Sequence, residues 1–304
     1  MNAKRTLSAN LSLLAAVALA LPGIAFGAPQ QKIEDRRPVS PDVRVEIDDI
    51  IVGQIRVVGT DDNELYVTGT IGRDVDEFVI EGGPDWIEIS AEWDDDMDDH
   101  ESEGRRRWRG HGRDSKDVAI DIEIHVPRGA SLEITGVTAS ISVDGVDGEI
   151  ELETVTGEIT YAGNAVTLEI VNVTGAISVT GGIIQEGCFE SVMGSIHVEA
   201  SAAANASLDF QTVGGSIYFA GDIGEGSDLD FETVQGAVTL VLPASVSARF
   251  DIETMMGEID NELGPEPRRT SRWLQSKELS FRTGSGDADV SIETLQGKIT
   301  LRKQ

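Results

Sequence analysis

Acidic side chains with calcium-like spacing open a charged stretch in the first half of the chain. Asp94, Asp96 and Asp98 have the first three spacings of a calcium-binding loop, in which carboxylate oxygens are the ligands that Ca²⁺ takes. The sixth position of that loop is an aspartate where glycine is needed, and the twelfth is an arginine where a bidentate glutamate is needed. Seven acids here precede six basic residues, which favours mutual neutralisation within a polar loop. We therefore expect no cofactor, and the sequence leaves calcium at these three aspartates open.

Two groups of arginine and tryptophan side chains are candidates for contact with a partner. Arginine beside tryptophan is common in the energetic centres of binding surfaces, and it also suits anionic sugars. Each group could equally fold back onto the acidic body of its own chain, and the sequence leaves both interpretations open. The first group is Arg105, Arg106, Arg107, Trp108 and Arg109, and the second is Arg268, Arg269, Arg272 and Trp273.

The residue pattern offers no catalytic candidate. The four histidines do not cluster by spacing, and the chain contains neither a G-x-S-x-G element nor a zincin pair of histidines. We therefore expect a protein that is not an enzyme. A calcium-assisted polysaccharide lyase or hydrolase stays an alternative, because sites on stacked β-structures are assembled from residues on several turns of the chain.

A ten-residue motif recurs through the second half of the chain, for example FETVQGAVTL from Phe231 to Leu240. When each copy is numbered from its glycine, apolar residues fall at positions −7, −5, −2, +2 and +4. The copies follow one another at 18 to 21 residues, except for a last step of 40. A fixed period near 20 residues predicts stacked units that cannot bury their apolar faces alone. The glycines are Gly157, Gly175, Gly194, Gly215, Gly236, Gly257 and Gly297, and Ala139 takes this place in an earlier copy.

The alternation of apolar and polar residues within each copy predicts strands. A stack of hairpins would place Gln235 and Gly236 in a tight turn, with Phe231 opposite Leu240. That pairing would turn Val234 away from the core, yet position −2 is apolar in every copy. A coil with a corner between positions −5 and −2 would instead point all five apolar positions inward. We therefore prefer an all-β fold in the form of a parallel β-solenoid of about eight rungs, whose glycines face inward or supply a bend with positive φ.

Two polar rows accompany the apolar ones. Position −4 holds glutamate in most copies, and stacking in chain order would place Glu232 and Glu253 about 5 Å apart on adjacent rungs. We interpret this row as a solvated charged face. Position −3 carries Thr, Ser or Asn and predicts a stacked hydrogen-bonding ladder. Cys188, the only cysteine, cannot form an internal disulfide and is expected to be a buried, unreactive thiol at an apolar position.

The N-terminus indicates export. Residues 1–27 combine Lys4 and Arg5 with an apolar run that ends in small residues, which is typical of a signal peptide. The remaining 277 residues hold 22 basic against 54 acidic side chains, a net charge of −32, which argues against nucleic acid and anionic lipid as partners. No later apolar run is long enough to span a membrane. We expect a protein of the periplasm or cell surface of a bacterium, with no transmembrane segment after removal of the signal.

These observations divide the chain into three parts. The parts are a signal peptide at 1–27, an N-terminal β region at 28–130 that contains the charged loop 94–116, and the repeats at 131–304 with an insertion at 262–280. The N-terminal region includes a looser copy of the motif around Gly53. We expect its strands to pair in antiparallel fashion and to cap the stack, because terminal rungs would otherwise offer unpaired strand edges.

The repeats resemble a bacterial family of β-strand-repeat domains called the "putative adhesin" family, which is related to the head domains of auto-transporter adhesins. The resemblance rests on VPRGASLEI from Val126, on the serial V-x-G-x-I-x-V units and on FRTGSGDADVSIETLQGKITL from Phe281. It covers most of the mature chain and implies a β-solenoid-like fold with a role at the cell envelope. Its motifs are architectural and bring no functional residue. We expect a non-enzymatic binding protein for an envelope protein or polysaccharide, and an accessory role in envelope signalling is a further alternative.

Overall fold

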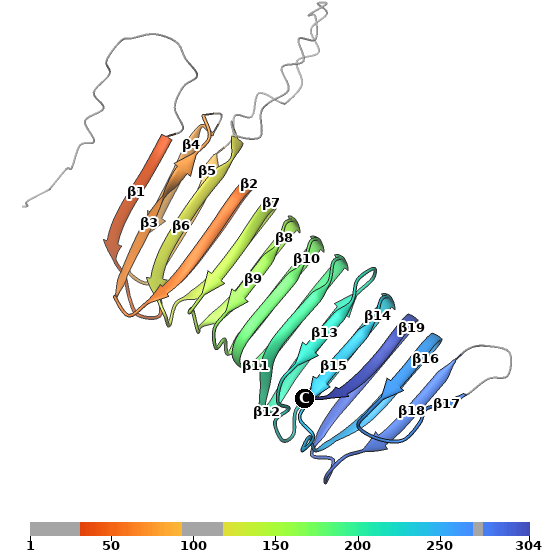
Figure 1. Ribbon diagram of the computed structural model, residues 1–304. Helices are drawn as coiled ribbons and strands as arrows, with labels where there is room; N and C mark the ends of the chain where they lie inside the picture. Colours follow the sequence, from red (N-terminus) through yellow and green to blue (C-terminus); the bar gives the residue numbers. More distant parts are fainter. Residues whose placement is uncertain (1–30, 74, 93–117, 270–275) are drawn as a thin grey trace, which may run out of the picture.

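The computed structural model describes residues 31–73, 75–92, 118–269 and 276–304, which form nineteen strands connected in one sheet (Figure 1). The first six strands are β1 (Gln31–Pro38), β2 (Arg44–Thr60), β3 (Glu64–Ile71), β4 (Glu77–Gly82), β5 (Trp86–Glu92) and β6 (Ile120–Pro127). The repeats form β7 (Ser131–Asp144), β8 (Glu149–Thr156), β9 (Ile159–Ala162), β10 (Thr167–Thr174), β11 (Ile177–Met193), β12 (Ile196–Thr212), β13 (Ile217–Ala220), β14 (Asp228–Gln235), β15 (Val238–Leu242), β16 (Ala248–Asn261), β17 (Arg268–Arg269), β18 (Lys277–Arg282) and β19 (Ala288–Lys303). The prediction of an all-β fold is confirmed.

Neighbouring copies of the motif pair in parallel and in register. The segments at positions −8 to −3 form one wall, in the order β7, β8, β10, β11, β12, β14, β19 and β16. The segments after the glycine form a second wall, which includes β9, β13 and β15. Phe231 pairs with Phe210 on one side and with Ile292 on the other, so it does not face Leu240 across a hairpin. The hairpin arrangement is therefore wrong for this chain.

The core lies between the two walls and is built from positions −7, −5, +2 and +4, as the sequence pattern predicts. Phenylalanines at position −5 stack within this core: the ring centroids of Phe189 and Phe210 lie 4.9 Å apart, and those of Phe210 and Phe231 lie 4.5 Å apart. In-register parallel pairing places identical side chains on adjacent strands, which are ~4.8 Å apart, so the repeat itself produces this stack.

The prediction that position −2 is a fifth core position is wrong. Thr233 at position −3 is only 5% exposed, whereas Val234 at position −2 is 42% exposed. The inward–outward alternation of β14 continues through position −3, and the chain turns the corner only after it. Valine at position −2 therefore belongs to the outer surface, and the polar residue before it points inward.

The glycine of the motif is required by the stacking of these corners. A Cβ on Gly236 would lie 1.7 Å from the carbonyl oxygen of Gly215, its counterpart on the next strand. The absence of a side chain lets the backbones of neighbouring copies approach each other. The prediction that the glycine Cα–H bond faces the core is wrong, because the space lies toward the neighbouring strand. The predicted positive φ is found at Gly157 (151°) and Gly175 (141°).

The last strand of the chain lies inside the sheet and not at its end. β19 pairs with β14 on one side and with β16 on the other, so the copy that contains Gly297 separates the copies that contain Gly236 and Gly257 (Figure 1). Glu232 and Glu253 are therefore not neighbours, because Glu293 lies between them. Part of the predicted insertion at 262–280 forms β17 and β18, and β18 pairs antiparallel with β16 at this end of the sheet.

The N-terminal strands close the other end with mixed pairing. β1 pairs antiparallel with β3, β3 with β6, and β4 with β5, as expected for a cap. β2 contains the copy around Gly53 and pairs in parallel with β5, β6 and β7, so it joins the cap to the repeats. In the part of the chain that the structure describes, no helix is long and apolar enough to cross a membrane. The predicted signal peptide at 1–27 and the charged loop 94–116 lie outside the described residues.

Candidate functional site

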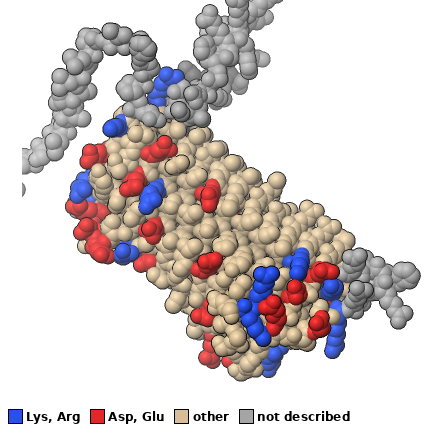
Figure 2. All heavy atoms as spheres, viewed as in Figure 1, with Lys and Arg blue, Asp and Glu red and all other residues tan. Residues whose placement is uncertain are grey.

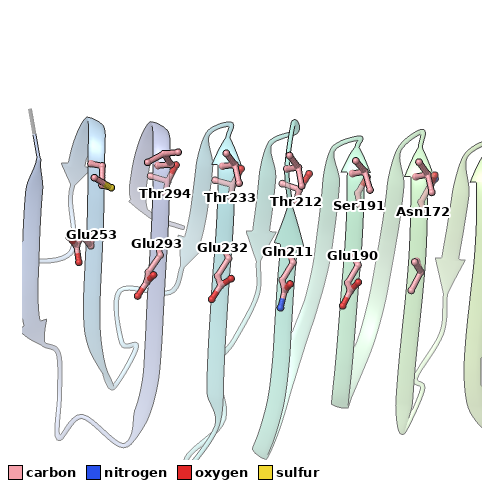
Figure 3. Close-up of a pocket in the computed structure, with 17 residues that line it drawn as sticks. Asn172, Glu190, Ser191, Gln211, Thr212, Glu232, Thr233, Glu253, Glu293 and Thr294 are labelled. Carbon is pink, nitrogen blue, oxygen red and sulfur yellow. The ribbon is translucent and has the colours of Figure 1, made fainter.

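A groove of about 510 Å³ runs across the outer face of the first wall, over six neighbouring strands (Figure 3). The side chains at positions −4 and −2 of each strand form its two banks, and position −3, whose side chain points inward, lies between them. The groove runs across the strands, because each strand contributes one residue to each bank. The strands are β10, β11, β12, β14, β19 and β16, in that spatial order.

One bank of the groove belongs to a continuous row of exposed apolar side chains at position −2, which we call the apolar stripe. Eleven of the fourteen large hydrophobic residues that are exposed among the described residues lie at position −2 or −1. Monomeric proteins rarely gather exposed apolar side chains in one contiguous patch without a use for it. The apolar stripe consists of Ile51, Val137, Val155, Val173, Val192, Val213, Val234, Leu295 and Met255, in the order of the strands.

The other bank is a row of carboxylates, which we call the acidic bank. It consists of Glu190, Gln211, Glu232, Glu293 and Glu253, on five successive strands (Figure 3). Among the described residues, no Lys or Arg forms an ion pair with any of these four glutamates. The predicted row of exposed glutamates is confirmed, but with a strand order that puts Glu293 between Glu232 and Glu253. The charges of this bank are available to a cationic partner.

The surface around the groove is also acidic. Residues 129–248 contain seventeen Asp and Glu residues and neither Lys nor Arg. Basic side chains gather instead toward the two ends of the molecule on the face that Figure 2 shows. Partial burial, together with the neighbouring carboxylates, raises the pKa values of Asp209 and Asp228, which lie on the same wall as the acidic bank. Within the described residues, the stretch 129–248 therefore carries acidic side chains without a Lys or Arg of its own to offset them.

The polar residues at position −3 stabilise the corner below the groove. Thr154, Asn172, Thr212 and Thr233 each donate a hydrogen bond to the backbone carbonyl at the glycine position of the preceding copy, at 2.8 to 3.4 Å. The predicted ladder thus exists, but it joins side chain to backbone and not side chain to side chain. The hydroxyls of Ser191, Thr254 and Thr294 are buried and have no hydrogen-bond partner among the described residues.

Most of the predicted site residues lie away from the groove or outside the described residues. The aspartates proposed for calcium, Asp94, Asp96 and Asp98, lie outside the described residues, as do Arg105, Arg106, Arg107, Trp108, Arg109, Arg272 and Trp273. Arg268 and Arg269 form β17, which pairs with β18 beyond β16, and the side chain of Arg268 is exposed. Within the described residues, no group of three His, Cys, Asp or Glu side chains is placed to hold a metal ion.

The interpretation of Cys188 as a buried thiol at an apolar position is wrong. Cys188 lies at position −6 on the outer face of the first wall and is partly exposed, with its Sγ 3.7 Å from Oε1 of Glu190. Partial burial and the carboxylates around it raise the pKa of this thiol to about 11. Its low reactivity is expected for that reason, because the thiolate is the reactive form.

Two histidines lie on outer faces, as their alternation with apolar residues predicts. His125 makes a 2.9 Å contact with Glu123, and His197 makes a 3.1 Å contact with Glu199. The rings of His197 and Tyr218 are stacked with centroids 4.5 Å apart on the outer face of the second wall. Neither pair adjoins the groove.

Comparison with known proteins adds three solved structures of low similarity. A "putative adhesin" from Bacteroides fragilis is 12% identical, with 91% of this chain and 98% of that chain covered at a TM-score of 0.43. A "putative cell adhesion protein" from Clostridium sporogenes is 11% identical, with 90% and 100% covered at a TM-score of 0.25. A "putative lipid binding protein" from Parabacteroides distasonis is 12% identical, with 90% and 96% covered at a TM-score of 0.32. No family model matches the chain, and no curated protein matches it. At this level of similarity these structures identify neither a ligand nor a functional residue for this chain.

The apolar row at position −2 is visible in the sequence, but its period alone predicts burial in the core. A polar residue at −3 followed by an apolar residue at −2 is compatible with two orientations. Either the apolar side chain points into the core, or the polar one points inward to form a hydrogen bond and the apolar one points outward. Only a pairing scheme for the strands decides between the two orientations.

Proposed function

We propose that this protein is an exported binding protein of the bacterial cell envelope, without enzymatic activity, that holds a protein or polysaccharide partner along the groove. In this proposal the stack of parallel strands is a β-solenoid, and its regular outer face is the binding surface. The observation that carries the proposal is the apolar stripe. Nine exposed apolar side chains in one row leave apolar area in water that a partner would cover, at roughly 25 cal/mol per Å².

The repeat supports this interpretation, because position −2 is apolar in every copy although its side chain lies outside the buried core. A threonine there would have the same β-branched shape and the same preference for strands. The signal-like N-terminus and the net charge of −30 support an exported protein that repels anionic lipid and nucleic acid.

The proposal is tested with arrays of glycans and of peptides, probed with the exported chain and with a variant that carries Val192→Thr, Val213→Thr and Val234→Thr. These changes keep the shape of the apolar stripe and remove its apolar character. Circular dichroism and the melting temperature of the variant should match those of the wild type. We expect at least one class of array probe to bind the wild type and to lose about tenfold in affinity for the variant.

Deletion of residues 94–116 provides the comparison with the charged loop, which contains one of the two predicted Arg/Trp contacts with a partner. Binding that the loop deletion abolishes and the threonine variant retains would contradict the assignment of the site to the groove. Binding that both changes leave intact would contradict it as well.

A further inference from the structure

We infer that the occupant of the groove is a cationic amphipathic polypeptide that lies as a helix along the stack, and this inference rests on the proposed function. The groove offers a partner two parallel rows of different chemistry, the apolar stripe and the acidic bank. A matching partner must therefore present apolar and cationic groups side by side over several strands.

The charge of the groove selects the class of partner. The four glutamates of the acidic bank have no Lys or Arg partner among the described residues, and residues 129–248, which include Glu190 and Glu232, contain neither Lys nor Arg. Such a surface would repel anionic polysaccharides. Neutral polysaccharides would place hydroxyl groups against the valines of the other bank, which is an unfavourable contact. Lysine and arginine next to leucine or phenylalanine satisfy both banks, because each cation meets a carboxylate and each apolar side chain meets Val192, Val213 or Val234.

The spacing of the strands selects the conformation of the partner. Each bank repeats at ~4.8 Å, the distance between adjacent strands. One helical turn advances 5.4 Å, whereas residues on the same side of an extended strand repeat at roughly 6.7 Å. Over the roughly 24 Å that separate β10 from β16, a helix drifts out of register by about 3 Å and a strand by about 10 Å. A helix of about 16 residues therefore spans the groove with its side chains near both rows.

The test uses a labelled 18-residue peptide of Lys and Leu, designed as a helix with a row of Leu beside a row of Lys, in fluorescence anisotropy with the exported chain. A peptide with Glu in place of every Lys serves as the charge control. The groove variant carries Glu232→Gln, Glu293→Gln and Glu253→Gln. Its matched control carries Glu149→Gln, Glu151→Gln and Glu169→Gln, which remove the same charge from the same wall outside the groove.

We expect the Lys/Leu peptide to bind the wild type, to bind the groove variant about tenfold more weakly and to bind the matched control within about twofold of the wild type. The threonine variant of the apolar stripe should also bind it more weakly, and the Glu peptide should not bind. Equal losses for the two glutamine variants would overturn the inference, since they would indicate attraction to an acidic surface in general.

The outcome also separates this inference from the proposed function. Suppose that a neutral glycan binds the wild type and loses affinity for the threonine variant, while the Lys/Leu peptide does not bind. The cationic helix would then be wrong and the groove would remain a binding site. If no peptide and no glycan depends on groove residues, both the inference and the proposed function are wrong.

Discussion

Thr233 and Val234 are consecutive residues with opposite environments. The hydroxyl of Thr233 is buried and donates a hydrogen bond to the carbonyl oxygen of Gly215, while the side chain of Val234 is 42% exposed at the edge of the groove. The same arrangement recurs along the stack and creates both the buried polar row and the apolar stripe. The groove is therefore a product of where each copy turns its corner.

Replacement of Val234 with Asp should leave the fold intact, because the new carboxylate points into solvent. We expect an unchanged circular dichroism spectrum and a change in unfolding free energy within about 0.5 kcal/mol. Phe231→Asp is the matched control: it places a charge at a position that is 0% exposed and should prevent folding. A Val234→Asp variant that fails to fold would show that position −2 is buried.

The buried hydroxyls at position −3 should differ according to whether they have a partner. Thr233→Val removes the donor to Gly215 and should destabilise the protein by about 1 kcal/mol in urea unfolding. Thr254→Val removes a buried hydroxyl that has no partner, so it should be neutral or stabilising. Equal losses at the two positions would show that shape, and not the hydrogen bond, determines this row.

Gly236→Ala should destabilise the stack strongly, because the added methyl group would overlap the carbonyl oxygen of Gly215. We expect a loss of about 3 kcal/mol in unfolding free energy. Gly83→Ala is the control, since no atom lies within 4 Å of the position of its Cβ, and it should change the unfolding free energy by less than about 0.5 kcal/mol. Similar values for the two variants would contradict the close stacking of the corners.

The position of β19 inside the sheet can be tested with engineered disulfides in a Cys188→Ser background. Cysteines at Glu232 and Glu293 would lie on paired strands ~4.8 Å apart, within the range that a disulfide spans, and should crosslink on oxidation. Cysteines at Glu232 and Glu253 would lie two strands apart, beyond about 7 Å, and should stay reduced in a thiol assay. The opposite result would mean that the copies stack in chain order.

The stability of the protein should rise as the pH falls from 7 toward the ordinary carboxyl pKa values of 4.5 for Glu and 3.8 for Asp. The pKa values of Glu151, Asp209 and Asp228 are raised by partial burial and by neighbouring carboxylates. A carboxyl whose pKa is higher in the folded state binds protons there first, so its penalty is present at neutral pH and is relieved as the pH decreases. We expect the melting temperature to increase by roughly one to three degrees over this range.

The Asp209→Asn and Asp228→Asn double variant is the control for this pH dependence. It should melt higher than the wild type at pH 7 and show a flatter profile, because the repulsion is already gone. The pKa of Asp287 is lowered by hydrogen bonds from Ser285 and Ser247, and the stability that it contributes is lost only at lower pH, below the usual aspartate value of 3.8. A melting temperature that falls steadily from pH 7 to pH 4.5 would contradict this account.

The sequence by itself determined that this chain is all-β, that its units repeat and that they stack. The alternation around Phe231 predicts strands within one copy, and the period of about 20 residues predicts that the copies stack. The exposed glutamates and the hydrogen-bonding role of position −3 could also be predicted, because a charged side chain avoids the core and a threonine can satisfy a nearby carbonyl.

The tertiary structure decided the direction of Val234, the order of the last two copies and the existence of the groove. Valine favours a strand whichever way it faces, so composition could not reveal that the corner comes after Thr233 and not before it. β16 and β19 carry the same motif, so the sequence of the motif does not show which of the two pairs with β14. The strand order therefore depends on β18, which pairs with β16, and on the path of the chain back into the sheet. Only this pairing sets the acidic bank beside the apolar stripe on five neighbouring strands.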